Sequence, residues 1–270
     1  MPIQKPRVAA VSYLNTVPLV WGALHGAQQM DMDVNFFLPS ECADAVRANR
    51  ADAGILPIVE IARQGLEIFP GTGIACHGPV RSILLISKVP PPQIKTLACD
   101  RGSRTSVMLA RVILSERYGA HPVLLPPASP VLAQMLQTAD AALIIGDPAL
   151  ALNPDSLSFY CMDLGQQWLE LSGLPMVFAA WAAAPHWVTP SLTKAFIDSL
   201  AFGLQNLDKI VALESASRGF SPTTTREYLT KYIVFELGQT EYDGLNTFLG
   251  KAAKLEPSLL NNVAEIVTSL

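Results

Sequence analysis

Short runs of consecutive apolar residues alternate with helix-like segments through the first half of the chain. Such runs lie at Ala9–Val11, Ile55–Leu56, Leu84–Ile86 and Leu143–Ile145, each followed by polar residues or a proline. Continuous apolar runs are typical of parallel strands that are covered on both faces. We therefore predict an α/β protein in which these four segments are buried, mainly parallel strands.

This pattern occurs twice along the chain. An apolar strand, a polar loop, a helix, a strand ending in proline, a second helix and a strand opening with Ala-Asp-Ala follow one another in the same order. The repeated strings are Ala51–Ala53 and Ala139–Ala141. The same offset places Ser12 opposite Asp100 and Asn15 opposite Ser103. The repetition predicts two similar lobes, each with a mainly parallel sheet flanked by helices.

The last third of the chain has no counterpart in the first half. Thr189-Pro190 and the capping box from Thr240 each predict the start of a helix, and Ser221-Pro222 predicts another that runs through TTTREYLTKYIVFELG. We expect these helices to pack on the first lobe. The three prolines of Val89–Gln93 predict a stiff connector between the lobes. The predicted division is therefore residues 1–90 plus 183–270 for lobe I and 91–182 for lobe II.

Composition narrows the class of protein. The 270 residues are 50% apolar and 16% charged, which excludes an intrinsically disordered chain. The net charge is −4, without the basic footprint of a nucleic-acid binder. The longest apolar stretch, Leu174–Ala184, falls short of the ~20 residues of a membrane span. The N-terminus lacks the apolar region of a signal peptide. We expect a cytoplasmic protein with no nucleic-acid or membrane partner.

The cysteines and histidines indicate no metal site. Cys42, Cys76, Cys99 and Cys161 are isolated in the sequence, without a CxxC pair or histidines at metal-binding spacing. We expect reduced thiols. The usual patterns of a catalytic triad, a P-loop, a Rossmann fingerprint and HExxH are also absent.

Most candidate site residues follow the predicted strands, and Ser82 comes with the strand after His77-Gly78-Pro79. Open α/β sheets bind ligands outside the carboxyl ends of their strands, where helix N-termini favour carboxylate or phosphate. The side chains there are rich in neutral hydrogen-bond donors and include no histidine. They are Ser12, Asn15, Ser82, Asp100, Arg101, Ser103, Arg104, Thr105, Ser106, Gly146 and Asp147. This set predicts a cleft between the lobes that binds a small anion with two acidic groups.

The same residues also suit local structural roles. Ser12 and Asn15 are equally suited to closing a turn and capping a helix. The run from Arg101 to Ser106 is equally typical of a solvated capping loop, and Asp147 of a helix cap. Glu60 is expected to be a solvated charge. The residue pattern alone thus supports a two-lobed anion binder and no particular reaction.

The segment Val11–Leu19, VSYLNTVPL, resembles the N-terminal motif of the chorismate dehydratases of the futalosine route to menaquinone. Ser172 and Met176 stand where the family is expected to have threonine and phenylalanine, and we interpret both differences as variation in packing. Further segments similar to the family are GPVRSILL at 78–85, DRGSRTS at 100–106, GDPAL at 146–150, the region 163–181, YLTKYI at 228–233 and LG at 237–238.

This resemblance implies a type II periplasmic-binding-protein-like fold, two lobes joined by a hinge, without export. It implies a hydro-lyase that removes water from chorismate, a dicarboxylate, to give 3-[(1-carboxyvinyl)oxy]benzoate. Asn15 and Ser82 would be catalytic. Ser103, Thr105 and Ser106 would hold a carboxylate. No metal or organic cofactor is expected.

Two alternatives remain open. The sister enzyme that makes 1,4-dihydroxy-6-naphthoate has the same fold, but its family places a His-Glu pair where this chain has Ile145-Gly146-Asp147. A non-catalytic small-anion-binding protein is the other alternative. The absence of an export signal and of a helix-turn-helix segment weighs against a transport component and a regulator, respectively.

Overall fold

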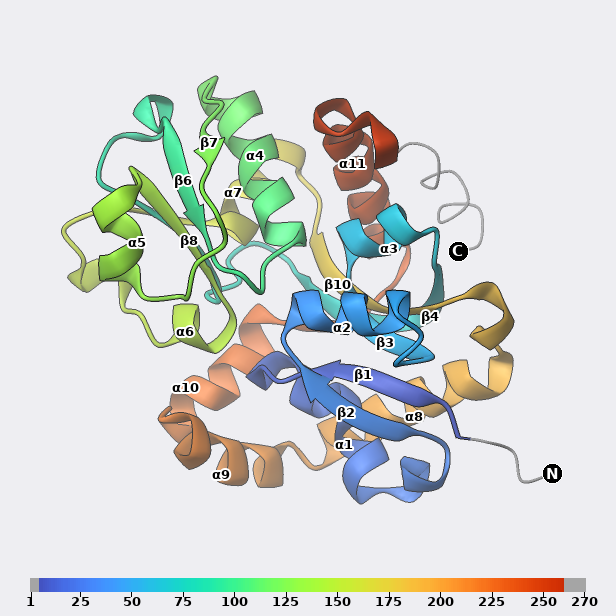
Figure 1. The fold of residues 1–270 in the computed structure, drawn as a ribbon. Coiled ribbons are helices and arrows are strands. Elements are labelled where there is room, and N and C mark those ends of the chain that lie inside the picture. Colours follow the sequence, from blue (N-terminus) through green and yellow to red (C-terminus); the bar gives the residue numbers. More distant parts are fainter. Residues whose placement is uncertain (1–4, 260–270) are drawn as a thin grey trace.

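The computed structural model describes residues 5–259, which form two α/β lobes side by side (Figure 1). Each lobe is built around one sheet. The first contains β1 (Arg7–Val11), β2 (Asp33–Phe37), β3 (Ala53–Pro57), β4 (Glu67–Cys76), β10 (Met176–Ala183) and β11 (Val234–Glu236), in the order β11-β4-β10-β3-β1-β2. The second contains β5 (Ile83–Ser87), β6 (Thr96–Cys99), β7 (Val123–Leu124), β8 (Ala141–Ile145) and β9 (Tyr160–Asp163), in the order β7-β6-β8-β5-β9.

Helices cover both sheets. Those attached to the six-stranded sheet are α1 (Val17–His25), α2 (Pro39–Arg47), α3 (Ile58–Gln64), α8 (Pro190–Gln205), α9 (Leu207–Arg218), α10 (Pro222–Glu227) and α11 (Gln239–Leu255). Those of the five-stranded sheet are α4 (Thr105–Tyr118), α5 (Leu132–Thr138), α6 (Gly146–Leu150) and α7 (Leu164–Ser172). None of the helices within residues 5–259 is long and apolar enough to cross a lipid bilayer.

The repeated order of elements predicted from the sequence is confirmed, while each sheet combines parallel and antiparallel strand pairs. In the first lobe β1 pairs in parallel with both β2 and β3. In the second lobe β6 pairs in parallel with both β7 and β8. The unit β1-α1-β2-α2-β3 therefore returns as β6-α4-β7-α5-β8, and the buried apolar runs in β1, β3 and β8 have the predicted positions and direction.

The strand β5 has the predicted position but the opposite direction. It pairs antiparallel with β8 and β9, so the prediction of a parallel strand at Leu84–Ile86 is wrong. All five of its residues are buried. A strand covered on both faces is continuously apolar whichever way it runs, so the pattern did not reveal the direction.

The chain passes between the sheets twice, once through residues 77–82 and once through 173–175. By sheet membership β5 belongs to the second lobe and β10 to the first, whereas the predicted boundaries at 90/91 and 182/183 place each in the other lobe. The three prolines join β5 to β6 within the second sheet, with a 3₁₀ turn at Pro91–Gln93. We therefore propose that the lobes are divided at the two crossings, and the proline run is not the connector.

The C-terminal helices α8 and α11 pack on elements of the six-stranded sheet and on α1. Along the contact of α8 with α1, the Ser199 hydroxyl donates to the Leu19 carbonyl at 2.8 Å. A Cβ on Gly203 would lie 2.1 Å from the Pro18 oxygen, so the close approach requires glycine there. The helix predicted from Ser221-Pro222 is shorter than expected. It continues as a π-helical turn, Tyr228–Tyr232, and then becomes β11.

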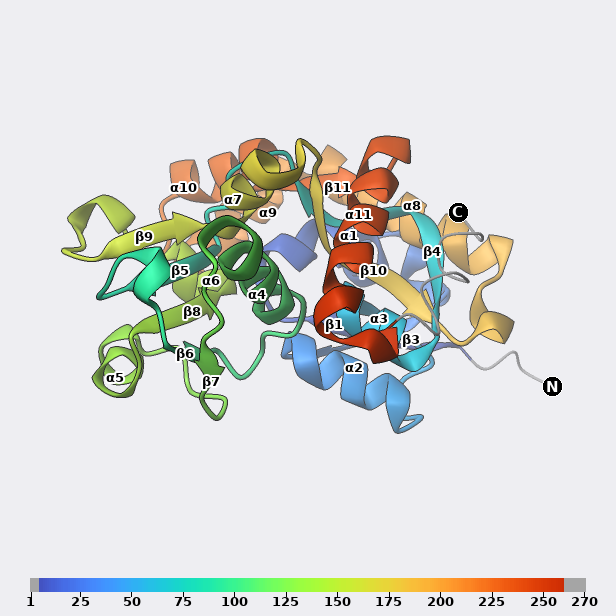
Figure 2. The same ribbon diagram turned by 90° about the horizontal axis from the view of Figure 1, so that it is seen from above.

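Seen from above, the two lobes lie next to each other with α4 and α11 close to their junction (Figure 2). Lys251 of α11 forms an ion pair with Glu116 of α4. Arg63 of α3 pairs with Glu256 at 2.7 Å, just after α11. The C-terminal helix thus contacts the second lobe while it packs on β10 of the first.

Candidate functional site

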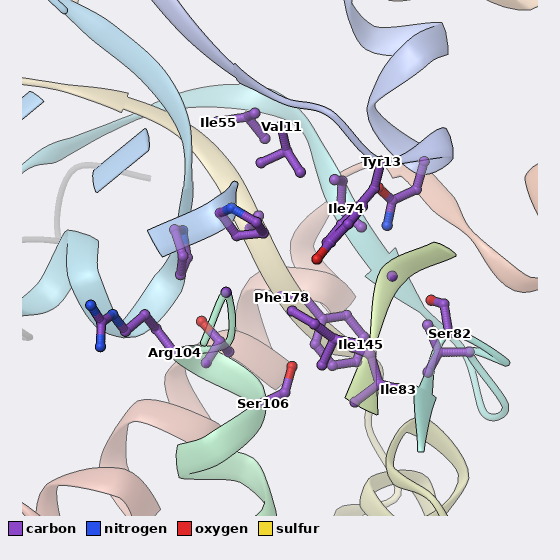
Figure 3. Close-up of a pocket in the computed structure, with 18 residues that line it drawn as sticks. Val11, Tyr13, Ile55, Ile74, Ser82, Ile83, Arg104, Ser106, Ile145 and Phe178 are labelled. Carbon is purple, nitrogen blue, oxygen red and sulfur yellow. The ribbon is translucent and has the colours of Figure 1, made fainter. Parts of the chain in front are cut away.

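A cavity lies between the lobes, at the ends of strands from both sheets. Its empty volume is about 560 Å³, part of which is open to solvent. Most of its wall is apolar, with Ile74, Ile145 and Phe178 among the lining residues. The polar side chains on the wall are Tyr13, Asn15, Ser82, Arg104, Thr105 and Ser106. In Figure 3, Arg104 and Ser82 lie on opposite sides of the pocket, with Ser106, Phe178 and Ile145 between them.

The cavity brings together most of the residues that the sequence singled out. Asn15, Ser82, Arg104, Thr105, Ser106 and Gly146 line it. Ser12, Ser103 and Asp147 do not belong to its wall. Among the lining residues of the described chain there is no histidine, lysine, aspartate or glutamate. The site therefore offers hydroxyls, an amide, one guanidinium and backbone amides, and no side chain that is a conventional base at neutral pH.

One end of the cavity is the N-terminus of α4. Thr105 and Ser106 are 3% and 5% exposed and form its first turn, directly after Arg104. The Thr105 hydroxyl accepts a hydrogen bond from the Val59 amide of α3 at 3.4 Å, so the starts of two helices from different lobes meet here. The first amides of a helix have no partner within it and favour a negative charge. This end is suited to a carboxylate.

Arg104 is held beside this end by a buried carboxylate. Glu60 is 4% exposed and pairs with Arg47 and Arg63, each at 2.6 Å. The Nε atom of Arg104 lies 4.0 Å from the same carboxylate. The expectation of a solvated Glu60 is wrong, because this part of α3 packs under the arginines. Arg104 thus lies both at the edge of this ionic cluster and at the edge of the cavity.

Ser82 lies on the first crossing between the lobes. The preceding residue, Arg81, has φ +65°, a left-handed conformation that is uncommon for a non-glycine residue. The Asp163 carboxylate accepts hydrogen bonds from the Val80 amide at 3.0 Å and the Arg81 amide at 2.7 Å. It also caps α7 through the amides of residues 165 and 166. Burial raises the pKa of Asp163, while these amides lower it. One carboxylate thus fixes the turn that presents Ser82.

The hydroxyl of Tyr228 lies behind Ser82 and Asn15. It donates a hydrogen bond to Ser82 Oγ at 2.8 Å. Tyr228 is 1% exposed and opens the π-helical turn. Burial raises its pKa above the ordinary value for tyrosine, and side-chain hydrogen bonds with Ser82 and Asn15 partly oppose the rise. Tyr228 lies in YLTKYI, one of the segments similar to the family, and was not among the candidate site residues.

Tyr13 is a second tyrosine that the sequence analysis did not select. Its pKa is raised by burial first and by the charges of Asp100 and Asp147 next, so the phenol keeps its proton. It lines the cavity and packs against Gly146 of the second lobe. Its position in VSYLN, between two candidate residues, was the signal available.

Ser12 and Asp147 take part in a contact between the lobes outside the cavity. Asp147 accepts a hydrogen bond from the Leu14 amide at 2.9 Å and pairs with Arg218 of α9. Arg218 also donates to the Ser12 carbonyl at 2.8 Å. The Ser12 side chain is exposed. Asp147 therefore joins the two lobes in this structure. No pattern in the sequence pointed to Arg218 as its partner.

Ser103 and Asp100 lie on the far side of the α4 start. Both line a separate depression, together with Arg104 and Arg111. Their Ser103 Oγ and Asp100 Oδ2 atoms are buried without a hydrogen-bond partner in the described part of the chain. Asn15 lines the cavity, whereas Ser103, at the corresponding position of the second lobe, does not.

Within residues 5–259 no group of three or more histidine, cysteine or acidic side chains is placed to hold a metal ion.

Two α/β lobes joined by two crossings, with a polar-ended cavity between them, define a type II periplasmic-binding-protein-like fold. Protein AF1704 from Archaeoglobus fulgidus superposes with a TM-score of 0.73 at 16% identity, covering 94% of this chain and 98% of that one. The periplasmic aliphatic sulphonate binding protein SsuA from Escherichia coli has a TM-score of 0.63 at 14% identity, covering 96% and 88%. At such identities the likeness concerns the fold.

The sequence places the chain more narrowly. It belongs to the family described as menaquinone biosynthesis, whose model matches residues 6–254. A chorismate dehydratase from Thermus thermophilus is 27% identical over 202 residues, 69% of this chain and 73% of the relative. A chorismate dehydratase from Campylobacter jejuni is 26% identical over 253 residues, 90% of this chain and 96% of the relative.

Proposed function

We propose that this protein is a hydro-lyase that converts chorismate to 3-[(1-carboxyvinyl)oxy]benzoate in menaquinone biosynthesis. The observation that carries the proposal is the composition of the cavity. A helix start suited to a carboxylate lies at one end, and Asn15 and Ser82 lie in another region of the same wall. Membership of the menaquinone family and the two chorismate dehydratase relatives support this choice of substrate.

The acidic groups of chorismate match the donors of the cavity. One carboxylate would be bound by the Thr105 and Ser106 hydroxyls and the first amides of α4, with Arg104 beside them. The apolar wall around Phe178 and Ile145 suits the face of the ring. The second carboxylate then faces the part of the wall that carries the other neutral polar side chains, Tyr13, Asn15 and Ser82.

The elimination balances without a protein base. The enolpyruvyl carboxylate takes the proton at ring carbon 3, the electrons of that C–H bond form the new ring double bond, and the C–O bond at carbon 4 breaks. The departing hydroxide takes up this proton and leaves as water. The ring becomes aromatic, so the thermodynamic drive is large, and the protein contributes mainly positioning and electrostatic stabilisation. Ser82 donates a hydrogen bond to the leaving oxygen, and Asn15 orients the reacting groups.

The test is direct. Purified protein is incubated with chorismate while ultraviolet spectra are recorded, and the product is identified by mass analysis. Loss of the diene absorption together with an aromatic product lighter by one water supports the proposal. A product of unchanged mass, or one that has lost pyruvate, indicates a mutase or lyase reaction and contradicts it.

A non-catalytic anion binder would bind chorismate and leave it unchanged. The sister enzyme that forms 1,4-dihydroxy-6-naphthoate would likewise leave chorismate unchanged. The cavity wall contains no His-Glu pair, and Ile145-Gly146 stands at the position where that family has one. This difference favours the dehydratase.

A further inference from the structure

Behind the cavity wall, the Tyr228 hydroxyl contacts both residues to which we assign the chemistry. It donates to Ser82 Oγ at 2.8 Å, and the Asn15 side chain is close enough to lower the pKa of the phenol. Tyr228 itself is not part of the wall and is 1% exposed. The three side chains come from the start of the first lobe, the first crossing and the C-terminal segment, so the contact requires the complete fold.

The hydrogen bond between Tyr228 and Ser82 runs from the phenol to the serine oxygen. A buried phenol with a raised pKa keeps its one proton, and this proton is donated to Ser82. The phenol then has no second hydrogen to give to Asn15, so the Asn15 amide NH₂ is the group of that side chain that can donate towards Tyr228. The hydrogen bonding thus has one polarity: the Tyr228 proton goes to Ser82, and the Asn15 carbonyl oxygen receives none from Tyr228.

This polarity determines what the two residues offer to a ligand. The Ser82 oxygen already accepts from Tyr228, and no group within residues 5–259 receives the Ser82 hydrogen, which is left to donate into the cavity. The Asn15 Oδ1 atom is buried and has no hydrogen-bond partner in the described chain. An unsatisfied buried acceptor of this kind is costly unless a ligand supplies a donor.

We infer that Tyr228 is a positioning residue that sets Ser82 as a donor and Asn15 as an acceptor, so that together they bind a hydroxyl group of the substrate. A hydroxyl both donates and accepts, which matches one acceptor and one donor side by side. The inference rests on the proposed function, in which this group is the leaving hydroxyl of chorismate. Ser82 then donates to the oxygen that departs, while Asn15 holds its hydrogen.

The experiment is a double-mutant cycle with Tyr228→Phe and Ser82→Ala, in which kcat and KM for chorismate are measured. Tyr228→Phe removes only the hydroxyl and is expected to lower kcat about tenfold to a hundredfold with little change in KM. In the Ser82→Ala background the same change is expected to cost less than about twofold, because no hydroxyl remains to be oriented.

Tyr242→Phe is the matched control. Tyr242 is also buried, and its hydroxyl accepts a hydrogen bond from the Gly71 amide at 2.9 Å, away from the cavity. We expect this variant to lose stability comparably and to keep kcat. Equal losses of kcat in the Tyr228→Phe and Tyr242→Phe variants, or a Tyr228→Phe effect that persists undiminished in Ser82→Ala, would overturn the inference.

Failure of the proposed function gives a different result. If the wild-type protein binds chorismate by calorimetry and does not dehydrate it, the dehydratase proposal fails. The same four proteins then test the orientation through dissociation constants. Additive losses of affinity would overturn the inference, and coupled losses would support it. If chorismate neither binds nor reacts, both are wrong.

Discussion

The ring of Tyr13 lies against Gly146 across the junction of the lobes, so closely that a Cβ on Gly146 would be 2.4 Å from Tyr13 Cε2. Gly146 has φ +65°, which also favours glycine. Tyr13 belongs to the turn after β1 of the first lobe, and Gly146 follows β8 of the second. The contact joins the end of the first strand of one repeated unit to the end of the third strand of the other, at the wall of the cavity.

We expect Gly146→Ala to lower kcat/KM at least about tenfold, because the new methyl group must displace Tyr13 from the cavity wall. Gly119→Ala is the matched control, since Gly119 has φ +62° and nothing lies within 4 Å of an added Cβ. In both variants the alanine must adopt a left-handed backbone conformation, which lowers stability by about 1–2 kcal/mol. Urea unfolding and steady-state kinetics measure the two effects. Equal kinetics in both variants would contradict a role for the Tyr13 contact.

Arg218 connects the two lobes through Asp147 and the Ser12 carbonyl. We expect Arg218→Met to raise KM about tenfold with a small change in kcat, because fewer molecules would hold the lobes in the binding arrangement. Lys194→Met, which removes an exposed pair with Asp198 on α8, is the control. An unchanged KM for Arg218→Met would show that this contact does not affect binding.

The sequence predicted the parts of the site that follow from strand order. Asn15, Thr105 and Ser106 come directly after the first strand of each repeated unit, and residues at such strand ends gather at one edge of a sheet. Ser82 was found by its place at the entry of an apolar run. These residues line one cavity because the two units face each other.

The residues that the sequence did not reveal contribute through long-range contacts. Tyr228 reaches Ser82 across 146 positions, and an aromatic residue in a helical pattern is indistinguishable from core. Glu60 looked solvated because its neighbours Arg47 and Arg104 come from other parts of the chain, whereas Arg63 lies on the same helix. The direction of β5 is set by the crossing at residues 77–82, which carries no hydrophobic pattern. Contacts between residues so far apart in the sequence depend on the tertiary structure and leave no local sequence pattern.

Asn15→Ala is expected to lower kcat by about a hundredfold to a thousandfold, since it removes a preorganised polar group from the reacting region. Asn35→Ala, at an exposed position of β2, controls for the loss of an asparagine. Circular dichroism and thermal unfolding check that the fold is retained. A near-full rate of dehydration in a folded Asn15→Ala protein would exclude the role given to this residue.

Arg104 and Ser106 are expected to act in binding. Ser106→Ala and Arg104→Met remove a hydroxyl and a guanidinium from the carboxylate end of the cavity, and each should raise KM about tenfold while kcat changes less. Arg226→Met is a suitable control, because Arg226 pairs with the exposed Asp208 away from the cavity. A fall in kcat with unchanged KM would place these side chains in the chemical step instead.

Asp140 ties the start of β6 to the start of β8. Its carboxylate accepts hydrogen bonds from the Lys95 amide, the Thr96 amide and the Thr96 hydroxyl, each at 3.0 Å. The Lys95 amide is the largest cause of a pKa below the ordinary 3.8. The ionised form therefore stabilises the fold above that value, and this contribution disappears as the pH falls below it.

We expect Asp140→Asn to lower the free energy of unfolding at about pH 7, and the difference from the wild type to shrink as the pH falls below the ordinary pKa of 3.8, because the native carboxylate then gains a proton. Denaturant unfolding across this range measures the difference. Asp31→Asn is the control, because the exposed Asp31 side chain accepts no hydrogen bond within residues 5–259. A difference that stays constant from neutral to acid pH would mean that the charge of Asp140 does not stabilise the strand pair.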